Sequence, residues 1–345
     1  MTPAAGAWPQ VPHGADLERA RRLYPEPRGG WLDLSTGINP RPWPAAAAAL
    51  RFGLDVWRDL PTPDAGLLTA FEGYYGAGAW PVPGSQAVIQ ALPRVWRRLH
   101  GTARCRVLAP GYGEHAARWA LEGHEVVLSG VDDMGQGDAE VRVLARPNNP
   151  TGDSLGIAPL RELASRSRLL VVDEAFLDVS GETSMAAEGL PNVVVLRSLG
   201  KFFGLAGLRV GAVLGDAPWL AALRAEIGPW SVNGPGLHLA AAALRDVDWQ
   251  REARGWLTGQ SLRLGALLDE AGLPHHGTPL FRTVATPRAR ALHEGLARRG
   301  LWTRLFELDA PRPWQALRLG LPGDAAGLER LAEALYEINR QEGQT

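Results

Sequence analysis

The chain has 345 residues, 46% hydrophobic and 21% charged, which is typical of a globular protein large enough for two domains. The formal net charge of −1 argues against a nucleic-acid groove or an anionic membrane surface as a partner. Cys105 is the only cysteine, so no intrachain disulfide is possible, and we expect a cytoplasmic protein without a membrane span or signal peptide.

The first 38 residues are irregular except for a short helix expected over residues 15–22, and another helix is expected over residues 45–50. From about residue 81 strand and helix patterns alternate. The expected strands cover residues 104–109, 125–128, 141–145, 169–173, 193–196 and 210–214, and the expected helices 86–99, 114–122 and 159–165. This alternation predicts an α/β fold with a mostly parallel sheet and helices on both faces.

A long helical region follows over residues 218–271, and a smaller α/β unit ends the chain. Its expected strands cover residues 280–285 and 316–319, and its expected helices 288–299 and 325–339. We therefore predict a large domain over residues 40–230 and a discontinuous small domain made of residues 1–39 and 231–345.

Lys201 lies in a loop among apolar and glycine residues, between Ser198 and Arg209. Taken alone it is most simply an exposed loop lysine. An apolar pocket, however, disfavours the ammonium form and lets the amine attack a carbonyl. Ser198 and Arg209 can bind a phosphate, and Asp173 ends an apolar strand where its carboxylate can hold a pyridinium nitrogen. A Schiff-base lysine with these ligands predicts a pyridoxal phosphate (PLP) site.

Other candidate cofactor-binding residues also follow a strand or begin a helix. In α/β proteins, ligands bind beyond the carboxyl ends of the strands. Gly84, Ser85 and Gln86 begin a helix whose N-terminal N–H groups can bind phosphate. Tyr112 can stack on a pyridine ring, and Asn149 can bond its phenolic oxygen. The alternative for each is an ordinary turn or packing role.

Two arginines point to an anion. Arg318 is a charge inside an apolar strand, and Arg304 lies 14 positions before it. They are either surface arginines with buried stems or a clamp for a carboxylate or phosphate. No Cys/His cluster has the spacing of a zinc site, so we predict no metal.

The combination of Ser198-x-x-Lys201 with Arg209, Asp173-Glu174-Ala175 and Asn148-Asn149-Pro150-Thr151-Gly152 resembles the class I/II aminotransferase superfamily of fold type I PLP enzymes. The resemblance covers nearly the whole chain. It implies a large PLP domain, a smaller domain built from both termini, and a homodimer with its sites at the subunit interface.

Five segments resemble more narrowly the threonine-phosphate decarboxylases of the cobalamin pathway: residues 13–17, 31–40, 83–87, 173–176 and 317–322. This resemblance implies conversion of L-threonine O-3-phosphate to (R)-1-amino-2-propanol O-2-phosphate and CO2. Many aminotransferases carry a tyrosine where Phe176 stands, and its hydroxyl donates to the phenolic oxygen of PLP. Phe176 has no hydroxyl, so that oxygen is left to Asn149. Related enzymes also use a tyrosine from the neighbouring subunit near the position of Leu60.

The reaction type depends on the orientation of the bound substrate, because PLP weakens the α-carbon bond that is perpendicular to its ring. If Arg318 holds the carboxylate in the ring plane, transamination follows. If Arg304 and Arg318 hold the side-chain phosphate, with His13 and Asn39 helping, the carboxylate leaves as CO2. The alternatives are a histidinol-phosphate-type aminotransferase and, more remotely, a PLP-domain ligand sensor without turnover.

Overall fold

The computed structural model describes residues 11, 13–309 and 311–342, and their contacts divide them into two units. The first unit holds residues 11, 42–149 and 153–250, and the second holds residues 13–41, 150–152 and 251–342. The division after Gln250 differs from the boundary that we expected near residue 230. The reason is that helix α9 (Gly234–Arg245) buries its apolar side chains against α4 (Ala65–Tyr75) of the first unit.

The first unit is built on a seven-stranded sheet in the order β2-β8-β7-β6-β5-β3-β4. Its strands are β2 (Trp80–Val82), β3 (Arg104–Leu108), β4 (Glu125–Ser129), β5 (Val141–Ala145), β6 (Leu169–Asp173), β7 (Val193–Ser198) and β8 (Gly211–Leu214). All neighbours pair in parallel except β8, which is antiparallel to both β7 and β2. The three central strands β5, β6 and β7 are buried along their whole length, as expected for strands covered on both faces. The predicted mostly parallel α/β sheet is confirmed.

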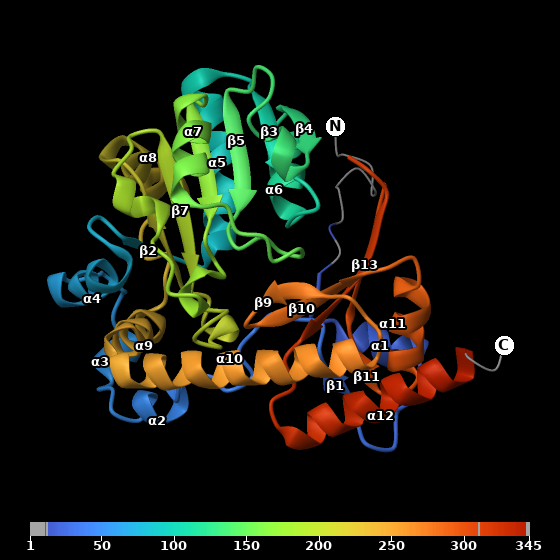
Figure 1. Ribbon diagram of the computed structural model, residues 1–345. Coiled ribbons are helices and arrows are strands. Elements are labelled where there is room, and N and C mark those ends of the chain that lie inside the picture. Colours follow the sequence, from blue (N-terminus) through green and yellow to red (C-terminus); the bar gives the residue numbers. More distant parts are fainter. Residues whose placement is uncertain (1–10, 12, 310, 343–345) are drawn as a thin grey trace. The chain divides into compact units, whose positions relative to one another are not determined.

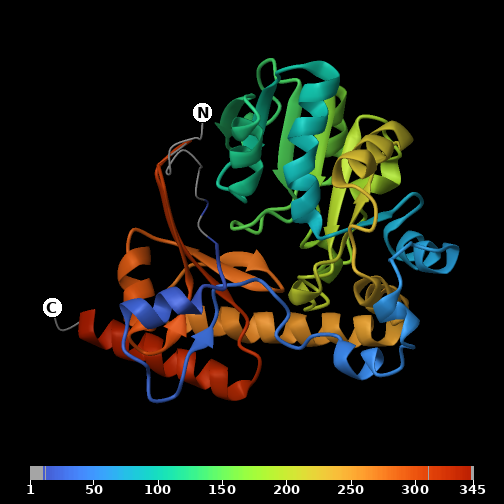
Figure 2. The same ribbon diagram turned by 180° about the vertical axis from the view of Figure 1, so that it is seen from behind.

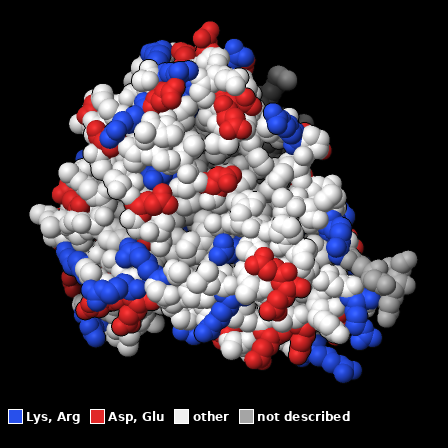
Figure 3. All heavy atoms as spheres, viewed as in Figure 1, with Lys and Arg blue, Asp and Glu red and all other residues white. Residues whose placement is uncertain are grey.

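Helices cover both faces of this sheet. Helix α7 lies in front of the strands in Figure 1, and α5 lies in front of them in the reverse view of Figure 2. Besides α4 and α9, the helices of this unit are α2 (Ala45–Ala49), α3 (Asp55–Arg58), α5 (Ser85–His100), α6 (Glu114–Leu121), α7 (Ile157–Ser165) and α8 (Ala217–Ile227). Helix α10 (Val247–Glu270) begins in the first unit and continues into the second. Figure 3 shows acidic and basic side chains interspersed over the visible face, in keeping with the net charge of −1.

The second unit contains an antiparallel sheet in the order β12-β13-β10-β9 and a short parallel pair, β1 with β11. The strands are β1 (Leu32–Asp33), β9 (His276–Thr278), β10 (Phe281–Ala285), β11 (Leu301–Trp302), β12 (Arg304–Leu308) and β13 (Trp314–Gly320). Its other helices are α1 (Leu17–Leu23), α11 (Ala289–Ala297) and α12 (Ala325–Glu342). The sequence pattern did not predict β12, the strand that carries Arg304. Among the described residues, none of the helices combines the length and the apolar character that crossing a membrane requires.

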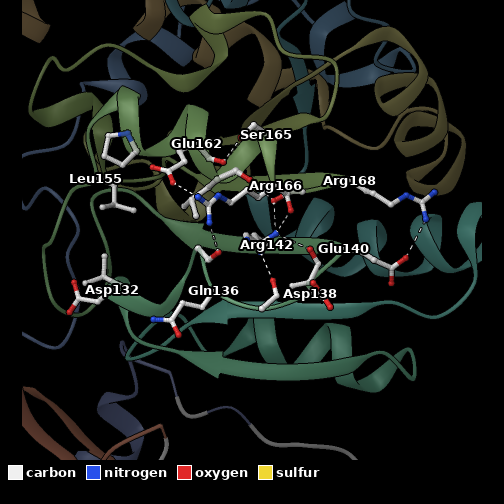
Figure 4. Close-up of a pocket in the computed structure, with 17 residues that line it drawn as sticks. Asp132, Gln136, Asp138, Glu140, Arg142, Leu155, Glu162, Ser165, Arg166 and Arg168 are labelled. Atoms are coloured by element: carbon white, nitrogen blue, oxygen red, sulfur yellow. Dashed lines mark hydrogen bonds and ion pairs between the residues drawn. The ribbon is translucent and has the colours of Figure 1, made fainter.

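A cavity of about 1130 Å³ opens at the amino-terminal edge of the central strands, with Arg142 at its centre (Figure 4). Arg142 is 1% exposed, and its guanidinium donates to the main-chain oxygens of Met134, Gly137 and Ala139 at 2.8–3.0 Å. A further bond to the carbonyl of Arg166 ties the same side chain to the end of α7. This arginine therefore fixes a loop to the sheet, and the cavity lies at the opposite edge from the strand ends that carry the predicted site.

Replacing Arg142 with methionine is expected to lower the free energy of unfolding by about 3 kcal/mol, because several buried carbonyls lose their charged donor at once. Arg168→Met is the matched control on the same cavity, since that side chain is 58% exposed and its ion-pair partner Glu140 is partly exposed as well. The control should lose no more than about 1 kcal/mol. Urea unfolding of the two variants measures the difference, and equal losses would contradict the structural role of Arg142.

Candidate functional site

The carboxyl ends of β6 and β7 bring three predicted site residues together. Asp173 ends β6 and Ser198 ends β7, and the register pairs Asp173 with Leu196 of the neighbouring strand. Both side chains are buried. Lys201 follows in the next loop, where its Nζ lies 5.4 Å from the centre of the Phe176 ring. The lysine thus lies beside the aromatic ring of Phe176.

A cradle for an anion lies at the start of α5. Gly84 has φ +74°, and a Cβ there would lie 2.8 Å from Nη2 of Arg209. A Cβ on Gly211 would lie 3.0 Å from the main-chain nitrogen of Ser85, and Gly211 pairs in register with Ser198. The helix N-terminus, a hydroxyl and a guanidinium therefore converge where glycines leave space. These donors fit the phosphate of PLP.

Tyr112 and Gln86 form a hydrogen-bonded chain beside this cradle. The Tyr112 hydroxyl donates to Oε1 of Gln86 at 3.1 Å, and Nε2 of Gln86 donates to Glu114 at 2.7 Å. Burial, and then the nearby carboxylates of Glu114 and Asp173, raise the pKa of Tyr112 to about 12, so that the phenol stays protonated. The amide side chain of Gln86 therefore orients the tyrosine ring.

His115 is a neighbour of the site that the sequence did not reveal. Its Nε2 lies 3.0 Å from Oδ2 of Asp173, and both side chains are buried. The other carboxylate oxygen of Asp173 accepts the N–H of Ala175 at 3.0 Å. The carboxylate is thus held at both oxygens, as a residue that must face a pyridinium nitrogen requires. A histidine in an amphipathic helix, 58 positions before its partner, carries no local signal of this role.

Asn149 lies in the loop after β5, at the same edge of the sheet. The preceding Asn148 fixes this loop, because its Nδ2 donates to the carbonyl of Pro110 at 2.8 Å and its main-chain nitrogen bonds the carbonyl of Asp153 at 2.7 Å. Asn149 itself is half-buried. All the predicted cofactor residues therefore lie within the first unit.

The four predicted substrate residues belong to the second unit. Arg304 and Arg318 face each other directly across β12 and β13. Arg304 donates to the carbonyl of His13 at 2.9 Å, and Arg318 donates to the carbonyl of Ser35 at 2.6 Å. Asn39 is buried, with its Oδ1 accepting the N–H of Arg41. The structure thus joins His13 to the arginine pair through its main chain.

Arg304 and Arg318 carry like charges directly opposite each other on two strands, and such charges repel each other. Burial, and then the facing Arg304, lower the pKa of Arg318, whereas Asp33 raises it. Burial, followed by Arg19, lowers the pKa of Arg304 as well. A bound phosphate or carboxylate would offset both effects and accept hydrogen bonds from two guanidinium groups. The second unit therefore contains a site whose chemistry suits an anionic ligand.

One signal in the sequence strengthens the assignment of Lys201. It is the only lysine among the 345 residues, so every other basic side chain that is permanently charged is an arginine. Arginine forms no Schiff base with an aldehyde at neutral pH, because its guanidinium stays protonated. Lys201 is therefore the only lysine side chain that can bind PLP covalently.

Comparison with known sequences identifies related proteins over almost the full chain. The profile of the family "Aminotransferase class I and II" matches residues 74–335. A threonine-phosphate decarboxylase of Pseudomonas aeruginosa is 45% identical over 94% of this chain and 96% of that protein. One from Sinorhizobium is 41% identical over 95% of this chain and 98% of that protein. A histidinol-phosphate aminotransferase of Legionella pneumophila is 35% identical, but over only 36% of this chain and 35% of that protein.

Two solved structures share the fold. The L-threonine-O-3-phosphate decarboxylase from Porphyromonas gingivalis has a TM-score of 0.75 at 20% identity, covering 89% of this chain and 99% of that one. The histidinol-phosphate aminotransferase from Sinorhizobium meliloti, solved in complex with pyridoxal-5'-phosphate, has a TM-score of 0.81 at 22% identity, covering 99% and 98%. At these identities the structural likeness establishes the fold alone.

Proposed function

Because the chain belongs to the class I and II aminotransferase family, we propose that it is a PLP-dependent decarboxylase acting on L-threonine O-3-phosphate. The products are (R)-1-amino-2-propanol O-2-phosphate and CO2, and the reaction serves cobalamin biosynthesis. The observation that carries this proposal is identity of 45% and 41% to threonine-phosphate decarboxylases over nearly the whole chain. The relatives named histidinol-phosphate aminotransferases match at lower identity and over shorter segments.

The residues of the first unit are suited to hold PLP. When bound, PLP supplies an electron sink for the bond that breaks at the substrate α-carbon. Asp173, supported by His115, would keep a proton on the pyridine nitrogen. Ser85, Ser198 and Arg209 would hold the phosphate at the start of α5.

Three further residues of the first unit would complete the cofactor site. Tyr112 would stack on the ring, and Asn149 would bond the phenolic oxygen. The Nζ of Lys201 would attach the cofactor and later deliver the proton that replaces the departing carboxylate.

The arginine pair of the second unit is proposed to hold the substrate phosphate. Two guanidinium groups that face each other across a strand pair can bind a dianion more firmly than either one alone. With Arg304 and Arg318 on the phosphate, helped by His13 and Asn39, the α-carboxylate stays free to leave. If Arg318 bound the carboxylate instead, the α-proton would be lost and transamination would follow.

The test is incubation of the PLP-loaded protein with L-threonine O-3-phosphate in the absence of any 2-oxo acid. Release of CO2 in a one-to-one ratio with aminopropanol phosphate is expected. A shift of the visible absorbance to that of pyridoxamine phosphate, without CO2, would instead identify an aminotransferase. Binding of PLP with neither outcome would favour a ligand sensor.

The partner of the chain is proposed to be a second copy of itself. The segment around α2 and α3 leaves Leu50, Leu54, Trp57 and Leu60 exposed, and Trp230 of the same unit is exposed as well. Large apolar side chains gathered in one short segment mark surfaces of association, and homodimers are typical of the family.

Replacing Trp57 with glutamate is expected to weaken the proposed dimer at least about tenfold, because a buried aromatic contact is exchanged for a charge. Leu262→Glu is the control, since Leu262 is equally apolar and exposed but lies on α10, outside that segment. Light scattering over a range of protein concentrations measures the dissociation constant. A wild-type chain that is monomeric at all concentrations would refute the proposal.

A further inference from the structure

A row of buried charges lies directly beside the predicted cofactor residues. Arg146, Glu174 and Arg197 stand at the ends of β5, β6 and β7, and the register of these strands places them side by side. Glu174 follows Asp173 in the chain, and Arg197 precedes Ser198. Each cofactor-binding residue that the sequence predicted on β6 and β7 is therefore adjacent in the chain to a residue of this row.

Glu174 is the centre of the row and has no exposed surface. One of its oxygens accepts from Nη1 of Arg146 at 3.3 Å and from the main-chain nitrogen of Met185 at 2.8 Å. The other accepts from Nη1 of Arg197 at 2.9 Å and from the hydroxyl of Ser184 at 2.5 Å. Each carboxylate oxygen thus accepts two hydrogen bonds, which offset the cost of burying the charge.

Arg197 extends the row away from β6. Its guanidinium also pairs with the buried Asp178 and lies 4.9 Å from the centre of the Tyr75 ring. Burial opposes the charge of Arg197, but Asp178 and Glu174 outweigh this effect and raise its pKa. Both arginines of the row therefore depend on carboxylates, and Glu174 is the one that they share.

Main-chain bonds connect the row to the site. The carbonyl of Asp173 accepts the N–H of Arg146 at 2.8 Å, and the carbonyl of Leu196 accepts the N–H of Glu174 at 2.9 Å. Successive side chains of a strand point to opposite faces, so Asp173 and Ser198 project away from the row. A shift of Glu174 or Arg197 on one face must therefore move Asp173 or Ser198 on the other.

Resting on the proposed PLP chemistry, we propose that Glu174 is a positioning residue. It locks the ends of β5, β6 and β7 in one register, and so sets where the Asp173 carboxylate stands relative to Ser198 and Lys201. Removing its charge leaves two buried guanidinium groups beside each other without the carboxylate that they share. The strand ends then separate, and the pyridinium and phosphate ligands no longer fit the cofactor together.

The experiment compares Glu174→Gln with Glu182→Gln in the full PLP-loaded chain. Glu182 pairs with the same Arg146, but its side chain is 41% exposed, so it is the matched control. For Glu174→Gln the dissociation constant of PLP should rise about tenfold or more, and the pH midpoint of the visible absorbance of bound PLP should move. Glu182→Gln should change neither. Circular dichroism of both variants without PLP reports their folding.

A milder variant keeps the test decisive if Glu174→Gln fails to fold. Ser184→Ala removes one of the four donors to Glu174 without altering any charge, and it should shift both quantities in the same direction by a smaller amount. A folded variant that is less stable but binds PLP with unchanged affinity and pH midpoint would overturn the proposal, leaving Glu174 a structural residue. Wild-type protein that binds PLP but releases no CO2 would refute the decarboxylase alone, since these binding readouts do not use turnover.

Discussion

Lys201→Ala is expected to abolish CO2 release, with kcat falling by about 10⁴-fold or more, and to remove the covalent attachment of PLP. The alanine has no amine to bind the cofactor aldehyde or to return a proton to the substrate. Because Lys201 is the only lysine, no neighbouring lysine side chain can substitute for it. Borohydride reduction of the PLP-loaded protein followed by peptide mass mapping measures attachment directly.

Lys201→Arg is the control that separates charge from chemistry. It keeps a cation near the Phe176 ring but forms no Schiff base, so it should be as inactive as the alanine variant. In the wild type, the reduced cofactor should appear on the peptide that contains residue 201. Measurable turnover in either variant, or a label elsewhere in the chain, would show that the site was assigned to the wrong residue.

Arg318→Gln is expected to lower kcat/KM for L-threonine O-3-phosphate by about 10²–10³-fold, since the substrate anion loses a buried charged partner. The loss should appear mainly in KM if the arginine binds the phosphate in the same way throughout the reaction. Binding of PLP, followed by visible absorbance, should stay as in the wild type, because the cofactor residues belong to the first unit.

Arg282→Gln is the matched control for this prediction. Arg282 lies on the adjacent strand β10, partly buried, and its guanidinium bonds the carbonyl of Ser261 at 3.3–3.4 Å. It should retain activity within a few fold of the wild type. Equal losses in the two variants would point to damage of the sheet. If Arg318→Gln left KM unchanged, the arginine pair would not be the anion site.

The sequence by itself predicts a set of cofactor residues because their signals are local. An apolar run predicts a buried strand, a polar residue at its end marks the ligand edge of a parallel sheet, and a glycine before a helix predicts an anion cradle. Asp173, Ser198, Lys201 and the start of α5 all obey these rules, and the structure brings them to one edge. The mostly parallel sheet followed from the same alternation of strands and helices.

Long-range packing decided the rest. The sequence suggested Arg304 and Arg318 as a clamp for an anion but could not show that they meet, whereas the pairing of β12 with β13 makes them directly opposed. His115 meets Asp173 across 58 residues, and Glu174 shares its carboxylate between two arginines of neighbouring strands. Local propensity carries no information on strand register or on how a helix packs against a sheet. Strand register and helix packing depend on which buried charges pair and which apolar faces pack together when the whole chain folds.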